Sequence, residues 1–403
     1  MTRIKVIGGG FSGMVMAYYL SREGFSVELH EARPRLGGLL GTEKTSSGGL
    51  AESAANGFIL SEDLQELFTE LGLDPLKPRA EYGKKRFIYR GGLSRWPLKF
   101  FESVGLIVKF LGRLIFLKKS LSPRPQETVW AWGERNLNEA ATRYLLSPGL
   151  QGIYAGDSRR MSAELILGPL FQKKKKQKYR GTVSLPGGMG EFIDTLAQGL
   201  SAQGVKIILN SNYKIKSLEE PHVIAVSAKE APAVVEAVAP QTAQVLRRIE
   251  TLPVLSVTVF YSEAEKKLEG FGGLFPEDQG FRVLGVLSPT YIFSERGPDY
   301  SETWIFGGTH SPEMLQKTNE EILAVIREER ARLFGGTARV KEARFYPWPA
   351  ALPHYTVAHQ DLLRELKTPP HLYLTGNYLG VIGLSKMLSR CKALASEMKR
   401  TLS

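Results

Sequence analysis

The sequence predicts an α/β protein, α+β overall, in which segments inserted into a first domain supply a separate sheet and a set of helices. Three observations favour this class. The chain opens with a strand, a glycine run, a helix and a second strand. Long apolar helical segments, and then several consecutive strand-like runs, occupy the middle of the chain. The last residues return to a strand followed by a helix, so we expect both ends to belong to one domain.

A glycine-rich turn near the N-terminus gives the clearest functional signal. A short apolar strand over residues 4–7 leads into Gly8, Gly10 and Gly13, which have the GxGxxG spacing. In such turns the first glycine allows the tight bend, the second lets a pyrophosphate approach the backbone, and the third lets a helix pack on the strand. The helix expected over Ser12–Glu23 would direct its free N–H groups and the positive end of its dipole at the phosphates.

The second strand ends in an acid that suits a ribose. This strand is expected over Ser26–His30, and Glu31 follows it, 18 residues past Gly13. A carboxylate in this place accepts hydrogen bonds from ribose hydroxyls and disfavours a 2′-phosphate, which indicates FAD or NAD. The run Arg35–Gly38 adds a second close approach of the backbone and a cation beside the pyrophosphate, and this favours FAD. The first domain is therefore expected to be Rossmann-like.

The composition is that of an ordinary globular protein with an excess of basic residues. The chain has 403 residues, of which 43% are hydrophobic and 23% charged, and this length allows two or more cores. The net charge of +12 suits an anionic partner such as a carboxylated substrate or an acidic membrane surface, although a solvated basic surface is the alternative. No pattern of a nucleic-acid module is recognisable, so we expect no nucleic acid, and we expect no metal.

The cysteine content and the N-terminus favour the cytoplasm. Cys391 is the single cysteine, so an internal disulfide is impossible and a reducing compartment is suitable. The chain opens directly on a strand without the features of a secretion signal. It also lacks a stretch of about 18 uncharged apolar residues, so no helix is expected to span a bilayer.

The pattern divides the chain into five segments. We expect residues 1–84, 181–250 and 346–403 to form the FAD-binding domain. Residues 85–180 would form a helical domain that contacts substrate or membrane, and residues 251–345 a substrate domain with a mixed sheet. Helices are expected over Glu62–Leu71, after Met189, over Asn319–Leu333 and from about Ser385. Strands are expected over Arg86–Gly92 (as a hairpin), Thr182–Leu185, Val205–Leu209, Leu255–Tyr261, Phe281–Leu287, Thr303–Gly307 and Leu372–Thr375, with Thr182–Leu209 making a second βαβ unit.

Two basic segments leave alternatives open. Pro97–Lys119 combines many large apolar side chains with lysines and an arginine, and it is almost free of acid. It is either a helix lying on an anionic membrane surface or a helix buried between domains whose lysines reach out to solvent. The run Lys173–Lys176 is either a solvated loop or a point of attraction for a membrane or substrate.

Several segments resemble the protoporphyrinogen oxidases, a branch of the flavin amine-oxidase superfamily. The Ile-Tyr-Ala-Gly-Asp run inside Leu150–Ser162 is the most specific of them. The segments that carry the resemblance are Glu127–Trp132, Leu150–Ser162, Ser184–Met189, Trp348–His359 and Gly376–Val381.

The resemblance implies a set of contacts with FAD. Ala54 to Gly57 would lie by the flavin, the backbone of Tyr213 would meet the adenine, and Trp348 would lie near the isoalloxazine. Gly376 and residues 381–383 would approach the pyrophosphate and ribitol, in front of the dipole of the C-terminal helix. The implied contacts are Gly8, Gly10, Phe11, Ser12, Gly13, Glu31, Ala32, Arg35, Gly37, Gly38, Leu39, Ala54, Ala55, Asn56, Gly57, Tyr213, Trp348, Gly376, Asn377, Val381, Ile382 and Gly383. A core role for Trp348, and structural roles for His354 and His359, are the alternatives.

The activity that the resemblance implies is FAD-dependent oxidation of a porphyrinogen in heme biosynthesis. The substrate would be protoporphyrinogen IX or coproporphyrinogen III, and dioxygen or another acceptor would reoxidise the flavin. N5 of the flavin would carry the chemistry, so no catalytic residue is assigned. Arg95, Lys99, Arg159 and Arg160 are candidate anchors for the substrate carboxylates, with exposed charges as the alternative. The enzyme would be cytoplasmic or peripheral on the inner face of the membrane, and the sequence does not predict its oligomeric state.

Two departures from the family pattern keep other functions open. Ala54-Ala55 replaces the usual Gly-Pro, and Lys386–Cys391 lacks the usual Asp-Cys and Ser-Gly pattern. The alternatives are another flavoenzyme of the superfamily (an amine oxidase, a carotenoid desaturase or a sugar-modifying enzyme) and a flavin-binding module without turnover.

Overall fold

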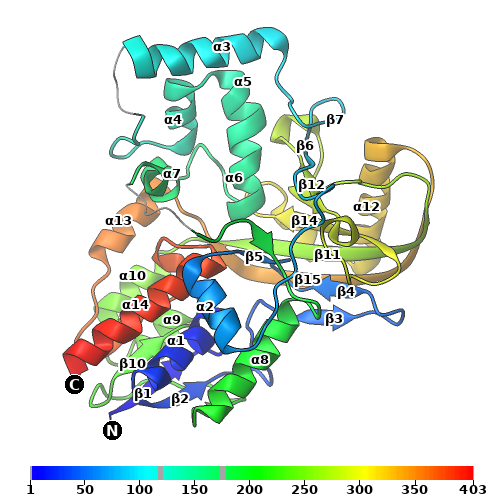
Figure 1. The fold of residues 1–403 in the computed structure, drawn as a ribbon. Coiled ribbons are helices and arrows are strands. Elements are labelled where there is room, and N and C mark those ends of the chain that lie inside the picture. Colours follow the sequence, from blue (N-terminus) through cyan, green and yellow to red (C-terminus); the bar gives the residue numbers. More distant parts are fainter. Residues whose placement is uncertain (1, 117–120, 173–177, 403) are drawn as a thin grey trace. The chain divides into compact units, whose positions relative to one another are not determined.

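The computed structural model describes residues 2–116, 121–172 and 178–402, and its elements are drawn in Figure 1. The chain divides into two compact units. Unit 1 comprises Met1–Lys77, Lys176–Thr251 and Leu362–Ser403, and unit 2 comprises Pro78–Lys175 and Leu252–Asp361. The basic run at 173–176 lies outside the described residues.

Unit 2 joins two segments that we expected to form separate domains. The strand β6 (Arg86–Tyr89) pairs in parallel with β12 (Gly272–Leu274), so residues from 85–180 and from 251–345 share one sheet. Unit 2 also extends to Asp361, whereas we expected the first domain to resume at residue 346. The reason is the long strand β15 (Ala338–Pro353), which the sequence analysis missed and which lies at the edge of that sheet beside β11.

Unit 1 is built on a parallel sheet of five strands in the order β16-β10-β1-β2-β9. The strands β1, β2 and β16 lie where the sequence predicted them. The strand β10 was not predicted, because only three of its residues are extended. The order reverses between β1 and β10, because the chain passes from β1 to β2 on one side and returns to β10 on the other. The strands of this sheet are β1 (Arg3–Ile7), β2 (Ser26–His30), β9 (Lys206–Ile208), β10 (His222–Ile224) and β16 (Leu372–Leu374).

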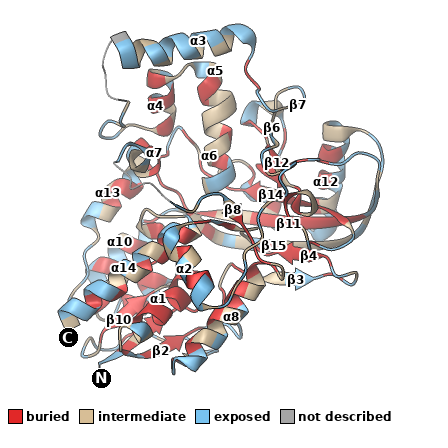
Figure 2. Ribbon diagram, viewed as in Figure 1, coloured by how far each residue is buried: buried red, intermediate tan, exposed pale blue. Residues whose placement is uncertain are grey.

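Helices pack on the parallel sheet and bury its apolar residues (Figure 2). Met14 of α1, Leu196 of α8 and Leu388 of α14 are fully buried in one cluster. The helices of unit 1 are α1 (Phe11–Arg22), α2 (Glu62–Glu70), α8 (Met189–Ala202), α9 (Ala231–Val235), α10 (Pro240–Arg247) and α14 (Leu384–Leu402), and α13 (Val357–Glu365) crosses the boundary at residue 361.

The expected second βαβ unit is wrong in its first strand. Only Thr182–Val183 is extended before the turn at Pro186, and this strand, β8, pairs antiparallel with β5 (Phe58–Ile59) outside the parallel sheet. Another small pair joins β3 (Thr42–Lys44) and β4 (Leu50–Glu52). The helix and strand that follow, α8 and β9, do lie where the sequence placed them.

Unit 2 contains a mixed sheet of seven strands in the order β15-β11-β14-β13-β12-β6-β7. The expected strand over Phe281–Leu287 shortens to its last three residues, although Phe281 and Val283 before it are buried in the same core as Val286. The remaining strands are β7 (Leu93–Ser94), β11 (Thr251–Ala264), β13 (Gly285–Leu287) and β14 (Tyr300–Gly307), and the helices beside them are α11 (Pro289–Ile292) and α12 (Asn319–Phe334).

The helical part of unit 2 includes one helix without any buried side chain. This helix, α3 (Phe100–Leu111), continues into a π-helical turn over Gly112–Phe116. The expectation of a helix buried between domains is therefore wrong for the described part of Pro97–Lys119. The other helices are α4 (Val129–Asn136), α5 (Glu139–Ala141), α6 (Ser147–Tyr154) and α7 (Ala163–Phe171).

A buried ion pair lies in the core of unit 2. The Glu302 carboxylate accepts hydrogen bonds from the hydroxyls of Tyr261 and Tyr300, both at 2.8 Å, and from Nε1 of Trp304 at 3.1 Å. Arg330 Nε lies 3.2 Å from Oε1 of Glu302, and both side chains are at most 5% exposed. Four neighbouring side chains thus donate to one charge, which is how a buried carboxylate is tolerated.

Arg330→Met should lower the free energy of unfolding by about 3–5 kcal/mol, because the Glu302 carboxylate would stay buried without its cationic partner. Urea unfolding followed by tryptophan fluorescence measures this loss. Arg327→Met changes an exposed arginine of the same helix and should shift stability by less than about 0.5 kcal/mol. Equal stabilities for the two variants would contradict the role given to Arg330.

Candidate functional site

The carboxyl ends of three neighbouring strands form one edge of the sheet in unit 1. Ala225 N donates to the Ile7 carbonyl at 2.8 Å, and Thr375 N donates to the Ile224 carbonyl at 2.8 Å, so β1, β10 and β16 end together. The strand order reverses at this edge, and open α/β sheets bind ligands in the crevice at such a point. The sequence motifs at the two ends of the chain meet here.

The N-terminal helix and the C-terminal helix begin at this same edge. Cys391 Sγ lies 3.5 Å from the Ser12 carbonyl, and Ser12 Oγ lies 3.7 Å from Sδ of Met387. The buried Cys391 thus fills the contact between α1 and α14, at a position where the sequence departs from the family pattern. Two positive helix ends consequently converge on the strand ends.

The glycine turn has the geometry that its spacing predicts. Gly8 has φ +108°, and a Cβ at Gly13 would overlap the Gly8 carbonyl oxygen, so the third glycine is what lets α1 pack on β1. A Cβ at Gly10 would meet nothing closer than the Gly38 Cα at 3.8 Å. The first turn of α1 contains no acid and its N-cap provides no side-chain hydrogen bond, so the free N–H groups of this turn fit a phosphate.

A second glycine loop lies against the first. Gly37 N donates to the Gly9 carbonyl at 2.8 Å, and a Cβ at Gly38, which has φ +61°, would lie 2.9 Å from the Gly10 Cα. Arg35 has a role that the sequence did not indicate, because it donates to the carbonyls of Leu36, Gly38 and Leu40 at 3.0–3.2 Å. Arg35 therefore braces the loop that leads to the half-buried Leu39.

Glu31 holds the glycine turn as well as facing the expected ribose. Its Oε2 accepts from Gly9 N at 2.6 Å, its Oε1 accepts from Arg33 N at 2.8 Å, and the residue is 9% exposed. A carboxylate has about four acceptor positions, so these two bonds leave room for ribose hydroxyls. Ala32, which follows it, is exposed.

The segment after β9 brings Tyr213 to the end of β2. The rings of Tyr213 and His30 have centroids 4.4 Å apart, and His30 Nδ1 lies 3.0 Å from Ser211 Oγ. Burial lowers the pKa of His30, with Lys5 acting in the same direction and Glu28 opposing it.

His222, whose ring centroid lies 6.0 Å from that of Tyr213, has a lowered pKa for the same main reason, burial. Lys5 again lowers this pKa, and Glu220 opposes the shift. The Tyr213 segment therefore packs on two imidazoles whose neutral forms the fold favours.

Two loops lie beside the start of α14. Residues 54–57 are half-buried between β4 and β5, where Asn56 Oδ1 is buried and finds no hydrogen-bond donor among the described residues. Ser385 Oγ donates to the Ile59 carbonyl, which ties α14 to β5. On the other side, Gly376 has φ +140° and leads through Asn377 into a short 3₁₀ turn.

The loop before α14 is open. Val381 and Ile382 are partly exposed, and a Cβ at Gly383 would meet nothing within 4 Å. These residues and the glycine turns all belong to unit 1, so the structure brings most of the predicted FAD contacts onto one body. The Phe11 ring is buried against Phe58 and Phe192, so only its backbone is free to contact a ligand.

The Gly-Gly-Met turn has a role that sequence reasoning missed. The buried carboxylate of Glu52 accepts from Thr42 Oγ1 at 2.6 Å and from Met189 N at 3.1 Å, at the N-terminus of α8. Gly188 is required because a Cβ there would contact this carboxylate. No sequence signal pairs Glu52 with a turn so far along the chain.

The remaining predicted residues lie in unit 2. Trp348 is half-buried on β15, and Arg95 and Lys99 are exposed just before α3. Arg159 and Arg160 are exposed after α6, so the four candidate anchors come from two separate segments.

The histidines of the family-like motifs are buried. His354 and His359 are 1% and 2% exposed, and a Cβ at Gly156 would lie 2.8 Å from the His354 ring. The Ile-Tyr-Ala-Gly-Asp run therefore needs its glycine to pack against the segment that contains His354. Ala155, with φ +53°, precedes it and accepts from Thr309 N at 2.9 Å.

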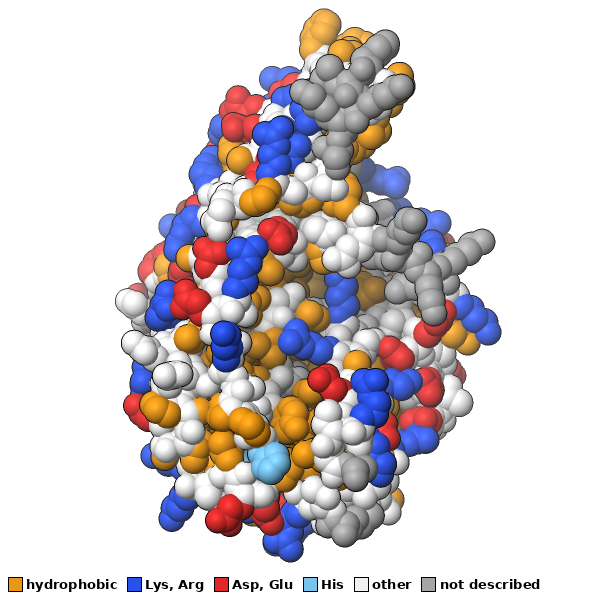
Figure 3. All heavy atoms as spheres, turned by 90° about the vertical axis from the view of Figure 1, so that its left-hand side faces the viewer, with side chains coloured by type: hydrophobic (Ala, Val, Ile, Leu, Met, Phe, Trp, Pro, Cys, Tyr) orange, Lys and Arg blue, Asp and Glu red, His pale blue; other side chains and the backbone are white. Residues whose placement is uncertain are grey.

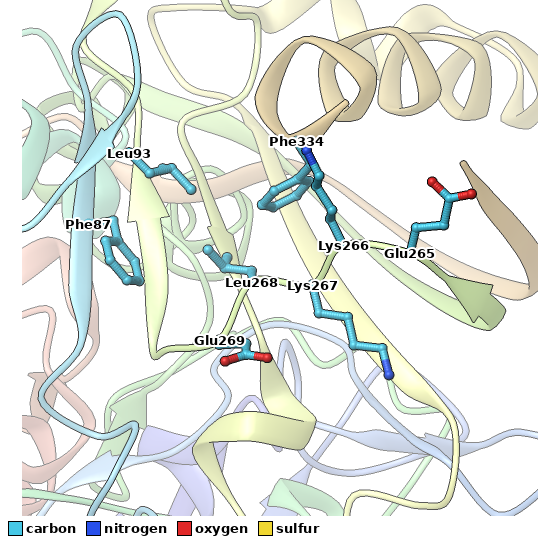
Figure 4. Close-up of a pocket in the computed structure, with 8 residues that line it drawn as sticks. All are labelled: Phe87, Leu93, Glu265, Lys266, Lys267, Leu268, Glu269 and Phe334. Atoms are coloured by element: carbon cyan, nitrogen blue, oxygen red, sulfur yellow. The ribbon is translucent and has the colours of Figure 1, made fainter. Parts of the chain in front are cut away.

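A hollow of about 460 Å³ in unit 2 contains none of the predicted site residues (Figure 4). Phe87 and Leu93 lie on one side of it and Phe334 on the other, and the amino group of Lys267 points away from them. Glu265 at its edge accepts from Thr337 N at 3.0 Å. None of the hollow's lining residues, all of which the structure describes, has a buried polar side-chain atom without a hydrogen-bond partner, so we assign it no role.

Two further searches of the described residues find nothing. No group of three or more His, Cys, Asp or Glu residues in that part of the chain could hold a metal ion. Among the helices that the structure describes, none combines the length and hydropathy needed to cross a bilayer.

Comparison with known proteins identifies the family. The model of the family described as "Flavin containing amine oxidoreductase" matches residues 11–383. Protoporphyrinogen oxidase 2 of Arabidopsis thaliana is 25% identical over 472 aligned positions, which cover 97% of this chain and 92% of the relative. Human protoporphyrinogen oxidase is 26% identical, with 94% of each chain covered.

Solved structures share the fold. A crystal structure from Exiguobacterium sp. 255-15, provisionally named a protoporphyrinogen oxidase, superposes with a TM-score of 0.81 at 18% identity and covers 99% of both chains. Cyclohexylamine oxidase from Brevibacterium oxydans IH-35A gives a TM-score of 0.73 at 17% identity, covering 100% of this chain and 99% of that one. The chain belongs to the flavin containing amine oxidoreductase family and is an FAD-dependent oxidoreductase.

Proposed function

We propose that this protein oxidises a porphyrinogen, protoporphyrinogen IX or coproporphyrinogen III, to the porphyrin in heme biosynthesis. The observation that carries this proposal is the alignment, over nearly the whole of both chains, with relatives named protoporphyrinogen oxidase. The net charge of +12 also suits a substrate with carboxylate arms. Dioxygen or another acceptor would complete the cycle.

The residues around the sheet edge of unit 1 fit FAD. The pyrophosphate would lie at the N-terminus of α1, beside the turn at Gly10 and the loop at Gly37–Gly38 that packs on it, where the absence of side chains leaves the backbone accessible. Glu31 would bind the ribose, the segment at Tyr213 the adenine, and residues 54–57 with 376–383 the flavin side. Bound flavin supplies the redox chemistry, and these residues bind, orient and shield it from water.

We further propose that α3 attaches the protein to an anionic membrane surface. Phe101 and Val108 are 84% and 65% exposed, and Figure 3 shows apolar side chains exposed at this end of unit 2. Another side of the helix is held by polar contacts, since Arg90 donates to both oxygens of Glu102 at 2.6 and 2.9 Å. Arg90 lowers the pKa of Glu102 to about 2, so this acid stays paired with it.

The charges of α3 suit anionic lipid. Lys99 precedes the helix, Lys109 lies in its last turn, and Arg113 follows in the π-helical turn. An amphipathic helix with cations beside a large apolar face lies in the interface of such membranes. A reduced, apolar substrate would then be received at the membrane, where its loss by oxidation is limited.

The activity is tested by mixing the flavin-loaded protein with protoporphyrinogen IX or coproporphyrinogen III without oxygen. The oxidised flavin absorbance should disappear while porphyrin fluorescence rises. Cyclohexylamine and a reduced polyene serve as competing substrates. Bleaching by the amine or polyene alone would assign another activity of the superfamily, and flavin that no donor reduces would indicate a binding module.

Gly10→Ala should weaken FAD binding, whereas Gly13→Ala should destabilise the fold. The Gly10 methyl group meets no protein atom closer than 3.8 Å, so the variant should fold and bind FAD at least about tenfold more weakly. The Gly13 methyl group would overlap the Gly8 carbonyl, so that variant should lose thermal stability even without FAD. The ratio of flavin to protein absorbance and the melting temperature of the apoprotein separate the two effects. Full flavin content in Gly10→Ala would contradict the proposed position of the pyrophosphate beside Gly10.

Flavin retention should depend on pH through His30 and His222. Their pKa values are lowered from 6.5 in the folded protein, so their stabilising contribution is complete above pH 6.5 and is lost as the pH falls toward the folded-state values. The rate of flavin release should therefore rise on acidification below pH 6.5. His30→Gln should flatten this rise, whereas His310→Gln, in unit 2, should leave it unchanged. A pH profile identical in His30→Gln and wild type would refute the link.

Membrane attachment is tested by flotation with vesicles. Wild-type protein should float with vesicles containing phosphatidylglycerol, and less with neutral phosphatidylcholine. The double variant Phe101→Ser with Val108→Ser should lose flotation at unchanged flavin content, because it removes exposed apolar area only. Leu209→Ser, a partly exposed leucine in unit 1, is the matched control. Flotation of the double variant at the wild-type level would contradict the role of α3.

A further inference from the structure

A small hollow in unit 2 lies against the exposed Arg159. It has a volume of about 60 Å³, more than one water molecule needs. All of its walls belong to unit 2. The lining residues are Trp130, Arg143, Ser147, Pro148, Gln151, Arg159, Pro276, Glu277 and Asp278.

Two guanidinium groups face this hollow with donors to spare. Arg159 Cζ lies 3.9 Å from the ring centroid of Trp130, and Arg143 Cζ lies 5.8 Å from the same centroid. Stacking on an indole leaves the N–H groups at the edge of the guanidinium plane available. Within the described residues the Arg159 guanidinium makes no hydrogen bond, and its nearest carboxylate is Glu277 at 3.8 Å.

The acids at the hollow do not saturate these arginines. Arg143 Nη2 donates to Glu139 Oε1 at 2.6 Å. Its Nη1 is 3.8 Å from Asp278 Oδ2, beyond the 2.7–2.9 Å of a charge-assisted hydrogen bond, and so stays available. Asp278 is already served by the hydroxyl of Tyr144 at 2.7 Å and by Gln279 Nε2 at 2.9 Å. Glu277 is the one competing acceptor for Arg159 among the described residues.

A buried amide points to a ligand in the same hollow. Gln151 is 2% exposed, and its Nε2 finds no acceptor among the residues that the structure describes. An unmet donor at such depth destabilises the folded protein, and an oxygen atom in the hollow would satisfy it. The amide and the arginines are all donors, so they select an acceptor-only group.

The site is held in shape before anything binds. Trp130 N donates to the Ser158 carbonyl at 2.9 Å, and Ser147 Oγ lies 2.8 Å from Ser158 Oγ. These bonds join the segment with Trp130, the helix with Gln151 and the loop with Arg159. Little ordering is therefore needed on binding.

We propose that this hollow is a binding site for a small carboxylate, held by Arg159, Arg143 and the Gln151 amide. The sequence analysis named Arg159 as a candidate carboxylate anchor, and the structure adds a cavity and a buried donor beside it. The ligand class is that of the substrate arms in the proposed function, and the inference rests on that function only for this choice of class. Binding needs neither flavin nor a reduced substrate.

The test is calorimetric titration of the full-length, flavin-loaded protein with propionate, with propionamide as the neutral control of equal shape. Propionate should bind saturably and propionamide should not. Arg159→Gln should weaken binding by about tenfold or more, as loss of a charged hydrogen-bond donor does. Arg327→Gln, which changes an exposed arginine of α12 in unit 2 that does not line the hollow, should have no effect.

Two further variants separate a carboxylate site from a trapped water. Gln151→Met keeps the volume and removes the amide, so propionate binding should weaken by about fivefold while the melting temperature stays equal or rises. Glu277→Gln removes the competing negative charge and should tighten binding by about threefold. Absence of saturable propionate binding, or unchanged affinity in Arg159→Gln and Gln151→Met, would overturn the proposal. The flavin spectrum, recorded on the same samples, reports failure of the proposed function separately.

Discussion

The close approach of α1 to β1 at Gly13 and Gly8 is the constraint on which the rest of unit 1 depends. A methyl group at Gly13 would overlap the Gly8 carbonyl, so the helix reaches this position only because the side chain is absent. That approach places the first turn of α1 at the ends of β1 and β10, where the strand order reverses. Glu31 then fixes the turn through Gly9 N, and the second glycine loop packs against Gly10. The proposed pyrophosphate site is thus built from backbone atoms of the two glycine loops, and side chains such as Glu31 hold those loops in position.

Other residues of the family-like motifs also serve to pack the fold. His354 and His359 are nearly fully buried. The absence of a side chain at Gly156 leaves room for the His354 ring. Glu52, the last residue of β4, accepts a hydrogen bond from Met189 N and so caps the N-terminus of α8. The segments that resemble the family most thus include residues that support the fold, and their presence alone does not mark a catalytic group.

Local patterns allowed the sequence to predict much of unit 1 and less of unit 2. The strand, glycine and helix periods of residues 3–30 are local, and the structure has them where the pattern placed them. The strand β10 was missed because three extended residues carry no periodic signal, although it lies beside β1 in the sheet. The long strand β15 was missed because its charged and apolar residues do not alternate regularly. Contacts between distant segments, such as Glu52 with Met189, leave no trace in the local pattern.

Amide hydrogen exchange in the presence and absence of FAD tests the central claim most directly. The account predicts that FAD slows exchange at the N–H groups of Phe11, Ser12 and Gly13 and at Gly38, because these groups would bond the pyrophosphate or lie under it. Exchange along α12, in unit 2, should not change. Unaltered exchange at residues 11–13, with protection confined to other segments, would contradict the placement of the cofactor at the start of α1.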